Sequence, residues 1–444
     1  MKVIVLGCNH AGTAAITQLR QRHPDVKVTA YDRNDNISFL ACGIALWVAD
    51  VVKDPQGLFY ASPESLAELG AEIHMRHDVE KIDFEKREVL VKNLDTGETF
   101  ADSYDKLILA TGSWPVTPPI PGIDLEGVKL AKLYQHAQDI IDKVNKPETK
   151  NAVVVGAGYI GVELVEAFHE HDKNVTLIEA EDRILSRYFD EEFTPAVEER
   201  MRENGIAVRT SEKVERFEGE NGKLTKVVTN KGEYPADIAI FSTGFAPNSE
   251  LYKDVLDTMP NGAVKVDGYM RSSRPEVMAC GDCAAVRSNA TGSDEYIALA
   301  TNAVRMGIMC AVNIKEPALE FPGVQGSNAI KVFGHCMAST GLSETAAKAR
   351  GMEVKTNLVE DASRAEFMPD YDQVKIKMVY DAATRRLLGA QIASDGDYTL
   401  AIHTISLAIQ KEMTVDEFAL VDFFFLPHFN KPVSYLTAVA LTAP

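Results

Sequence analysis

The chain has 444 residues, of which 45% are apolar and 25% are charged. A chain of this length normally divides into two or three domains, because a single hydrophobic core rarely supports more than about 250–300 residues. The sequence carries 46 Lys and Arg against 65 Asp and Glu, so its net charge of -19 opposes binding to nucleic acid or to an anionic membrane surface. We therefore expect no nucleic-acid partner.

The sequence also predicts no membrane segment and no disulfide scaffold. The N-terminus MKVIVLG has an apolar run of only four residues, too short for the core of a signal peptide, and no later run approaches the length that spans a membrane. Six cysteines are too few for a disulfide scaffold in so long a chain, and this usage is typical of a reducing compartment. We expect a cytoplasmic protein.

The first elements predict a dinucleotide-binding unit. Residues 2–7 form an apolar strand, residues 8–24 a glycine loop that opens a helix, and residues 26–33 a second strand. Gly7 and Gly12 occupy the outer positions of the glycine motif, but Asn9 stands where its second glycine is expected. Asp32 ends the second strand, where it can bind the ribose of a dinucleotide.

A lone thiol follows in the apolar stretch SFLACGIAL, residues 38–46. A free cysteine in such a run is usually a small buried hydrophobe, and it becomes a reagent only where neighbouring groups stabilise its thiolate. The stretch by itself leaves both interpretations of Cys42 open.

A second unit near the middle of the chain carries the stronger motif. Gly156, Gly158 and Gly161 follow an apolar strand directly, which is the setting that a pyrophosphate-binding loop requires. Glu179 lies 18 positions after Gly161, at the end of the next strand. A carboxylate there accepts hydrogen bonds from a ribose 2′-hydroxyl and repels a 2′-phosphate, so we expect NADH to be preferred over NADPH.

Two further apolar strands end in glycine turns, LILATGS at residues 107–113 and VMACGDCAAV at residues 277–286. An aspartate such as Asp282 after such a strand can bind the ribityl or pyrophosphate region of a flavin. Cys280 and Cys283 form a CxxC pair, but no second pair completes a metal site, and the strand-glycine-aspartate context explains the segment better. After about residue 320 the alternating pattern predicts a third, α+β domain.

The order of these motifs resembles the pyridine-nucleotide disulfide reductase superfamily over essentially the whole chain. The segments SFLACG, IALATNAVRMG, GVQGSN and FFFLPHFNKP are similar to its single-cysteine branch, which holds NADH oxidases, NADH peroxidases and coenzyme A-disulfide reductases. The resemblance implies an α/β protein with two Rossmann-like domains, one for FAD and one for NADH, and a C-terminal α+β domain that forms a homodimer. We expect a discontinuous FAD domain at 1–115 and 245–320, an NADH domain at 116–244 and an interface domain at 321–444.

The resemblance also implies which residues bind the cofactors. For FAD we expect Gly7, Asn9, His10, Ala11, Gly12, Asp32, Cys42, Val79, Ala110, Thr111, Gly112, Ser113, Lys132, Asp282, Leu299, Ala300 and Thr301. For NADH we expect Gly156, Gly158, Tyr159, Ile160, Gly161, Glu163, Glu179, Tyr188, Gly244 and Ala329. In addition, Tyr159 is expected to cover the nicotinamide side of the flavin until NADH displaces it, and His428 is open to contact with the flavin of a partner subunit.

Within the superfamily, Cys42 is expected to act alone. The dithiol members have a second cysteine five positions later, where this chain has Trp47. A single thiolate beside a flavin can cycle through a sulfenic acid or through a mixed disulfide. The family fold brings His10 beside Cys42, where its imidazole can hydrogen-bond the sulfur and relay protons. Cys42 and His10 are therefore the expected catalytic residues.

Two positions favour one reaction of the branch. Ala41 precedes the cysteine, where coenzyme A-disulfide reductases tend to carry asparagine, and Val304 stands where the peroxidase pattern has arginine. An apolar residue near the flavin suits access of oxygen. We expect a water-forming NADH oxidase whose substrates are NADH and O2, with an NADH peroxidase, a coenzyme A-disulfide reductase and a non-enzymatic redox sensor as alternatives.

Overall fold

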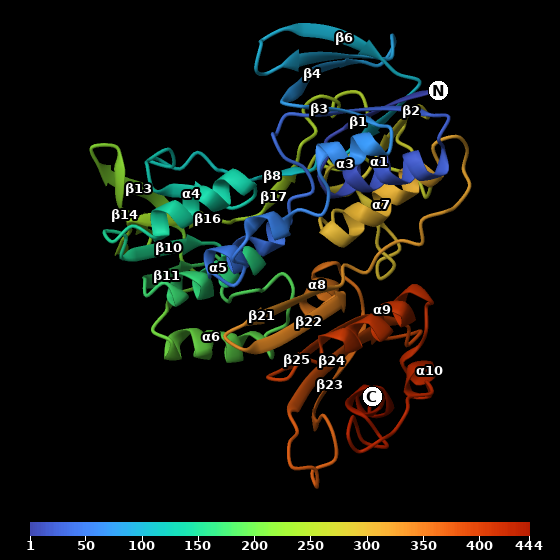
Figure 1. Cartoon of the computed structure of the whole chain (residues 1–444). Helices are drawn as coiled ribbons and strands as arrows, with labels where there is room; N and C mark the ends of the chain where they lie inside the picture. The colour runs from blue at the N-terminus through green and yellow to red at the C-terminus, as the bar shows by residue number, and fades with distance from the viewer.

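The computed structural model describes all 444 residues, and the chain builds three parts, each around its own sheet (Figure 1). The first sheet is parallel with the strand order β18-β7-β1-β2-β3. Its strands are β1 (Lys2–Leu6), β2 (Lys27–Asp32), β3 (Glu72–Met75), β7 (Lys106–Leu109) and β18 (Val277–Ala279). One strand thus joins this sheet from a segment about 170 residues downstream of the others.

Helices and a small sheet enclose the first sheet. The helices α1 (His10–Arg22) and α7 (Ala300–Val312) pack against each other, so closely that a Cβ on Gly307 would lie 2.2 Å from the carbonyl oxygen of Ala11. The antiparallel strands β4 (His77–Asp83), β5 (Glu88–Asn93) and β6 (Thr99–Ser103) bury Val79, Ile82 and Val89 in the same core. Short helices α2 (Ile44–Val48) and α3 (Pro63–Glu68) follow β2, and the short strands β19 (Val286–Arg287) and β20 (Asp294–Glu295) follow β18.

The second sheet repeats this plan. It is parallel with the order β12-β11-β10-β16-β9. Its strands are β9 (Val128–Leu130), β10 (Asn151–Val155), β11 (Asn174–Ile178), β12 (Ala207–Arg209) and β16 (Ile238–Phe241), accompanied by the helices α4 (Tyr134–Val144), α5 (Tyr159–Glu170) and α6 (Thr194–Glu203) and the antiparallel strands β13 (Val214–Glu220), β14 (Lys223–Thr229) and β15 (Glu233–Pro235). The strands β8 (Ser113–Pro115) and β17 (Phe245–Pro247) pair where the chain enters and leaves this part.

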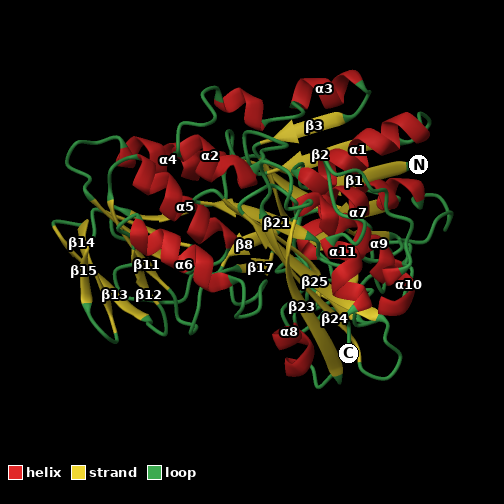
Figure 2. Cartoon of the chain, turned by 90° about the horizontal axis from the view of Figure 1, so that it is seen from below, coloured by secondary structure: helices red, strands yellow, loops and turns green.

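The third sheet is antiparallel with the order β21-β22-β25-β24-β23. Its strands are β21 (Asn328–Val332), β22 (His335–Gly341), β23 (Val354–Ala362), β24 (Gln373–Asp381) and β25 (Leu387–Ser394), followed or interrupted by the helices α8 (Glu344–Ala349), α9 (Ile402–Gln410), α10 (Val415–Ala419) and α11 (Tyr435–Leu441). Figure 2 shows α9, α10 and α11 gathered beside β23, β24 and β25. The expected fold class, with two parallel α/β units and an α+β end, is confirmed.

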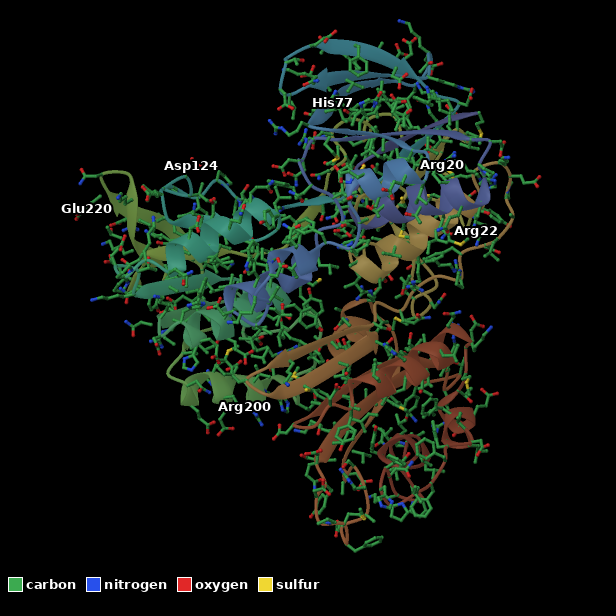
Figure 3. The ribbon with its side chains drawn as sticks, viewed as in Figure 1. Arg20, Arg22, His77, Asp124, Arg200 and Glu220 are labelled. Carbon is green, nitrogen blue, oxygen red and sulfur yellow. The ribbon has the colours of Figure 1, made fainter.

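The third part is held firmly against the second. Arg200 of α6, labelled in Figure 3, donates to the carbonyl oxygen of Phe333 at 3.1 Å and to Asp395 at 2.6 Å. The buried Lys377 lies 3.2 Å from Asp190 and 2.7 Å from Glu344. One apolar cluster also joins the segment around Cys42 to the second and third parts, through side chains such as Ile44, Phe168 and Met337. None of the helices combines the length and the apolar run that crossing a bilayer requires.

Candidate active site

The first glycine loop forms as its sequence predicts. Gly7 has a φ of 95°, which favours glycine, and a Cβ on Gly12 would lie 1.8 Å from the carbonyl oxygen of Gly7. Asn9 caps α1 in an ordinary extended conformation, so its position does not require glycine. The Oδ2 atom of Asp32 accepts a hydrogen bond from the backbone amide of Cys8 at 2.7 Å. The loop therefore presents a helix N-terminus beside a carboxylate, which suits a pyrophosphate and its ribose.

A cavity of about 940 Å³ opens directly over this loop. Twelve of the residues expected to bind FAD line it: Gly7, Asn9, His10, Ala11, Asp32, Val79, Ala110, Thr111, Gly112, Ser113, Lys132 and Asp282. Five others do not, namely Gly12, Cys42, Leu299, Ala300 and Thr301, although Ala303 of α7 does. Gly12 shapes the loop itself, because only a residue without a side chain fits so close to the carbonyl oxygen of Gly7. The cavity thus collects segments from the first part of the chain, the β8 region and the turn after β18.

Three polar side chains meet in this cavity. Ser113 Oγ donates to Asp282 Oδ2 at 2.8 Å, and Lys132 Nζ donates to Ser113 Oγ at 3.1 Å. The Lys132 ammonium also lies 3.6 Å from Asp282 and 4.6 Å from the centre of the Phe245 ring. Because these residues come from three distant segments, only the folded chain brings them together. They offer both an anion and a cation to a bound cofactor.

One end of the cavity is aromatic, which was not expected from the sequence. Tyr31 and His77 line it beyond Asp32, and the Tyr31 ring stacks on His74 with centroids 5.1 Å apart. At the rim, Arg33 forms a two-point ion pair with Asp78, with both closest contacts at 2.8 Å. Tyr31 directly precedes Asp32, and this adjacency was the one signal in the sequence. His77 and Asp78 gave none, because they arrive from β4.

Cys42 lies in a short 3-10 turn, Ala41–Gly43, that leads into α2. It borders a second cavity of about 520 Å³, lined also by Ala45, Glu163, Glu166 and Ala329. Cys42 is the one exposed cysteine of the chain. Even so, the surrounding protein raises the pKa of its thiol, first by desolvation and then through the negative charge of Glu163. The protein groups alone therefore do not stabilise the thiolate.

His10, the first residue of α1, does not contact Cys42. Its Nδ1 atom lies 2.9 Å from the hydroxyl oxygen of Tyr60, and the two rings stack with centroids 5.7 Å apart. The expected hydrogen bond between His10 and the Cys42 sulfur is absent, because the ring is turned to Tyr60. Burial lowers the pKa of His10, and Lys132 lowers it further, while Asp282 acts in the opposite direction. Tyr60 was not among the expected residues.

The second glycine loop has nearly the same backbone. Gly156 has a φ of 100°, and a Cβ on Gly161 would lie 1.9 Å from the carbonyl oxygen of Gly156. Glu179 accepts hydrogen bonds from the backbone amides of Ala157 at 2.6 Å and Glu181 at 2.9 Å. The carboxylate is thus oriented at the loop, as a ribose-binding residue must be.

Most of the other residues expected for NADH surround this loop. Tyr159 and Ile160 begin α5, and Gly158 caps it. Tyr159 stacks on Tyr188 with centroids 4.2 Å apart, and its hydroxyl donates to the side chain of Asn328. Gly244, with a φ of 113°, ends the segment after β16. Asn328 was missed, because it reaches the loop from the third part of the chain.

Glu163 is a partly buried carboxyl group beside Cys42. It lies on the first turns of α5 and borders the same cavity as Cys42. Burial, together with the neighbouring Glu166, raises its pKa to about 7. Glu163 can therefore hold or release a proton near neutral pH.

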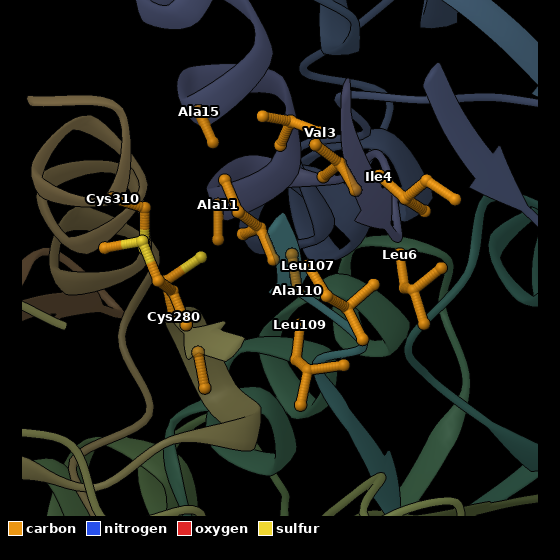
Figure 4. Packing of buried hydrophobic residues seen from close by; sticks show 14 of the residues in the cluster. Val3, Ile4, Leu6, Ala11, Ala15, Leu107, Leu109, Ala110, Cys280 and Cys310 are labelled. Carbon is orange, nitrogen blue, oxygen red and sulfur yellow. The ribbon is translucent and has the colours of Figure 1, made fainter. Parts of the chain in front are cut away.

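The CxxC pair is buried in the core of the first part. Cys283 donates weakly to the carbonyl oxygens of Leu109 and Cys280, each at 3.4 Å. Cys280 and Cys310, both labelled in Figure 4, belong to one cluster of buried apolar side chains. Hydrogen bonding to Cys310 and burial raise the pKa of Cys280 well above its usual value. These thiols are packing residues in this structure, as the sequence context favoured.

Comparison with known proteins gives consistent results. Residues 1–307 match the family model described as pyridine nucleotide-disulphide oxidoreductase, and residues 328–434 match that family's dimerisation domain. A protein from Enterococcus faecalis named NADH oxidase is 47% identical over 444 residues, covering 100% of this chain and 99% of that protein. An NADH oxidase from Lactococcus lactis is 44% identical and is covered completely, as is this chain.

Solved structures agree in fold and in size. The water-forming NADH oxidase from Lactobacillus brevis, bound to NADH, is 45% identical with a TM-score of 0.97, covering 99% of this chain and 97% of that chain. An NAD-dependent persulfide reductase from A. fulgidus is 31% identical with a TM-score of 0.95, covering 99% of this chain and 82% of that chain.

Proposed function

Because the chain belongs to the pyridine nucleotide-disulphide oxidoreductase family, we propose that it is a water-forming NADH oxidase that uses FAD and the single thiol of Cys42. The NADH oxidases from Enterococcus faecalis and Lactococcus lactis are 47% and 44% identical to it, and the match covers 99–100% of their length. The observation that carries the single-thiol part is the environment of the cysteines. Cys42 is exposed beside a cavity, whereas the five other cysteines are buried. One thiol is thus available for chemistry.

The cavity of about 940 Å³ fits FAD by the chemistry of its walls. The backbone amides at the start of α1 suit the pyrophosphate, and Asp32 suits the adenosine ribose. Gly281 supports the fit, since a Cβ there would lie 2.9 Å from the Cβ of Ala11, so the turn before Asp282 can approach closely only as glycine. FAD, when bound, supplies the transfer of electrons from NADH to oxygen. Lys132, Ser113 and Asp282 would hold and orient it.

The role proposed for Cys42 is to complete the reduction of oxygen to water. Its thiolate attacks one oxygen of hydrogen peroxide, the O–O bond breaks, and the leaving oxygen takes one proton and departs as water. The cysteine is then a sulfenic acid. Two further electrons from NADH and one proton break the S–O bond, release a second water and restore the thiolate. Two NADH are consumed for each O2.

The second glycine loop would hold NADH. Its amides suit the pyrophosphate, and Glu179 accepts from the ribose hydroxyl and repels an added phosphate, so NADH is the proposed donor. Tyr159 is proposed to lie over the flavin and to move when the nicotinamide binds. Glu163 would then face the nicotinamide region.

A homodimer is part of the same proposal. The C-terminal segment exposes Leu420, Phe424 and Phe429 with 64–82% of their side chains open, and residues 328–434 match a dimerisation domain. Apolar surface of this kind is stabilised when a partner covers it. The domain division at residues 115, 244 and 320, a cytoplasmic location and a contact of His428 with the partner stay predictions. Sedimentation velocity tests the dimer, because a monomer at micromolar concentration contradicts it.

The test of the function is the ratio of NADH consumed to O2 consumed, with hydrogen peroxide assayed at the end. Wild-type protein is expected to use two NADH per O2 and to leave no peroxide. In Cys42→Ser the ratio falls to one and peroxide accumulates, because a serine hydroxyl is a far weaker nucleophile. Cys336→Ser, which changes a buried thiol at the same cavity, is expected to keep the ratio at two.

Other results identify the alternatives. Consumption of NADH with added peroxide but not with O2 points to a peroxidase. Negligible consumption with either oxidant points to a redox sensor. If Cys42→Ser still reduces O2 to water, the thiol of Cys42 is not needed for the reaction.

A further inference from the structure

The segment of residues 185–190, between β11 and α6, runs from the second glycine loop to the third part of the chain. At its start, the backbone amide of Leu185 donates to the carbonyl oxygen of Ala157, inside the glycine loop, at 2.9 Å. At its end, the side chain of Asp190 is buried, with 2% of the residue exposed. Between these two points lies Tyr188, which is expected to contact NADH. The segment is therefore fixed at both ends.

The carboxylate of Asp190 accepts its hydrogen bonds from the third part of the chain. Thr345 donates to Oδ1 from its backbone amide at 2.9 Å and from its hydroxyl at 2.7 Å. The backbone amide of Glu344 and the side chain of Gln391 donate to Oδ2 at 2.9 Å and 2.6 Å. The ammonium group of Lys377 lies 3.2 Å from the same oxygen. Gln391 also accepts from the backbone amide of Asp190 at 2.6 Å. With so many donors on both oxygen atoms, Asp190 is held in one position.

These donors also keep Asp190 ionised. Burial acts to raise the pKa of this carboxyl group, but hydrogen bonds from Thr345, Gln391 and Glu344 lower it to about 2. Lys377, which is itself only 2% exposed, balances the negative charge. Separating a buried ion pair leaves a charge without compensation, so the contact between the segment and the third part resists opening.

The anchored segment determines where an aromatic ring lies beside the glycine loop. Tyr188, two residues before Asp190, stacks on Tyr159 with centroids 4.2 Å apart and an interplanar angle of 30°. The buried ring of Phe189 meets Tyr159 edge-on, with centroids 6.4 Å apart. The side chain of Arg183 donates to the carbonyl oxygen of Phe189 and ties the segment to the end of the preceding loop. The position of the Tyr188 ring thus depends on the anchor at Asp190.

We propose that Asp190 is a positioning residue for NADH, because it fixes the segment that carries Tyr188 and so orders the dinucleotide site before the nucleotide binds. The inference rests on the proposed function, in which Tyr159 and Tyr188 lie at the NADH site. Asp190 is enclosed by groups of the third part, so it acts through Tyr188 and not by contact with the nucleotide. The third part of the chain thereby contributes to nucleotide binding.

Order that exists before binding does not have to be created during binding. If the segment is loosened, part of the interaction with NADH is offset by the entropy lost when Tyr188 becomes ordered. The rate at saturating NADH is unaffected, because Asp190 lies away from the reacting groups. The expected signature is weaker binding of the nucleotide with an unchanged kcat.

The test is Asp190→Asn in the FAD-loaded protein, since an asparagine amide has nearly the same shape but cannot accept from all of these donors. We expect the KM for NADH to rise roughly threefold to tenfold, the range for ordering one side chain on binding, while kcat stays within about twofold. Isothermal titration calorimetry with NAD+ and the oxidised protein measures the same loss of affinity without turnover.

Asp395→Asn is the matched control. Asp395 also joins the second and third parts, through a hydrogen bond from Arg200 at 2.6 Å, but it lies outside the segment that carries Tyr188. A general weakening of the contact between the two parts would appear in both variants. We expect Asp395→Asn to change neither the KM for NADH nor the affinity for NAD+.

A double-mutant cycle separates positioning from other effects of the substitution. If Asp190 acts through Tyr188, Asp190→Asn changes the affinity for NAD+ little in a Tyr188→Ala background, because the ring that it positions is gone. Thr345→Val is the second variant, for use if Asp190→Asn does not fold. It removes one hydroxyl donor of the same carboxylate and is expected to shift the affinity in the same direction by a smaller factor.

Two outcomes overturn the inference. One is an unchanged affinity for NAD+ in whichever of Asp190→Asn and Thr345→Val folds. The other is an equal loss of affinity from that variant with and without the Tyr188 ring. Failure of the proposed function is seen elsewhere, in a Cys42→Ser variant that still uses two NADH per O2. The affinity measurements stand in that case, because they do not depend on the thiol.

Discussion

The two dinucleotide-binding units, β1-α1-β2 and β10-α5-β11, have almost the same backbone and different side chains at corresponding positions. In both units the first glycine has a φ near 100° and the last would place a Cβ within 2 Å of a carbonyl oxygen. In both, the acid at the end of the second strand accepts from the second amide of the loop, at 2.7 Å for Asp32 and 2.6 Å for Glu179. Backbone geometry therefore defines the motif.

The side chains decide what each loop does. His10 and Tyr159 occupy the same position, the first residue of the helix, and each stacks on a tyrosine from a distant loop, Tyr60 or Tyr188. The first loop thereby presents a group that can exchange protons, and the second presents a neutral phenol. In the proposed function, this position would serve chemistry in the first unit and cofactor access in the second.

The middle position of the glycine motif, Asn9 in the first unit and Gly158 in the second, does not require glycine. Asn9 and Gly158 are both helix caps with negative φ, and a Cβ on Gly158 would meet no atom within 4 Å. The asparagine that weakened the sequence motif is therefore harmless to the fold. The open space at Gly158 also means that the second unit does not need glycine there for its own packing.

The largest expected effect tests the shared backbone. Gly12→Ala and Gly161→Ala should each lower the free energy of unfolding by about 3 kcal/mol, the upper end of the usual cost of overpacking, because the added methyl would overlap a carbonyl oxygen of the loop. Gly158→Asn, which copies Asn9, should stay within about 0.5 kcal/mol of the wild type. Urea unfolding followed by circular dichroism measures all three. Similar losses in the three variants would contradict the comparison.

The next effect belongs to the second unit, where Glu163 corresponds in position to Ala14 of the first. The pKa of Glu163 is raised from its ordinary value of 4.5 to about 7. Between these values the folded state keeps a proton that the unfolded chain has lost, so this group makes stability fall as pH rises through that window.

Glu163→Gln should therefore be more stable than the wild type above pH 7, by up to roughly 3 kcal/mol, and equal to it below about pH 4.5. Thermal unfolding of both proteins across the pH range measures this difference. Ala14→Gly, at the corresponding position of the first unit, is not a suitable control because it changes helix propensity. Glu199→Gln, which makes the same change on the exposed face of α6, is a better one. Parallel curves for the wild type and Glu163→Gln would show that Glu163 ionises normally.

A smaller effect tests the difference between the two acids. Glu179→Ser should narrow the preference for NADH over NADPH roughly tenfold to a hundredfold, because the ribose loses a charged acceptor worth about 1.5–3 kcal/mol and the phosphate loses a repulsive neighbour. Glu199→Ser carries the same charge change away from the loop and should leave the preference unchanged. The measurement is the ratio of kcat/KM for NADH to kcat/KM for NADPH. If this ratio is the same in Glu179→Ser as in the wild type, the Glu179 carboxylate does not select the nucleotide.

The smallest effect concerns the aromatic pairs. Tyr159→Phe keeps the stack on Tyr188 and loses the hydrogen bond to Asn328, whose side-chain oxygen still accepts from Ser339 at 3.0 Å. Since the acceptor keeps a partner, the free energy of unfolding should fall by no more than about 1 kcal/mol. A large loss of stability in Tyr159→Phe would mean that the phenol anchors the loop to the third sheet.

The amino-acid sequence by itself determined the two α/β units. An apolar strand, glycines with fixed spacing and an acid at the next strand end are neighbours in the chain, and their contacts are local. For this reason the sequence predicted the glycine-loop positions of Gly7, Gly12, Gly156 and Gly161 and the strand-end positions of Asp32 and Glu179, while their roles in cofactor binding stay predictions. The sequence also predicted that Cys42 acts as a single thiol, since Trp47 stands at the position of a second cysteine.

Tertiary structure alone decided the partners of these residues. Tyr60 meets His10 across 50 positions, Asn328 meets Tyr159 across 169, and Ser113 meets Asp282 across 169. No local pattern encodes such pairs, because they depend on how helices, loops and sheets pack after they have formed. The expected contact between His10 and Cys42 failed for the same reason. A side chain bonds to the group that the packing of the chain places within hydrogen-bond distance. For the imidazole of His10, that group is the hydroxyl of Tyr60.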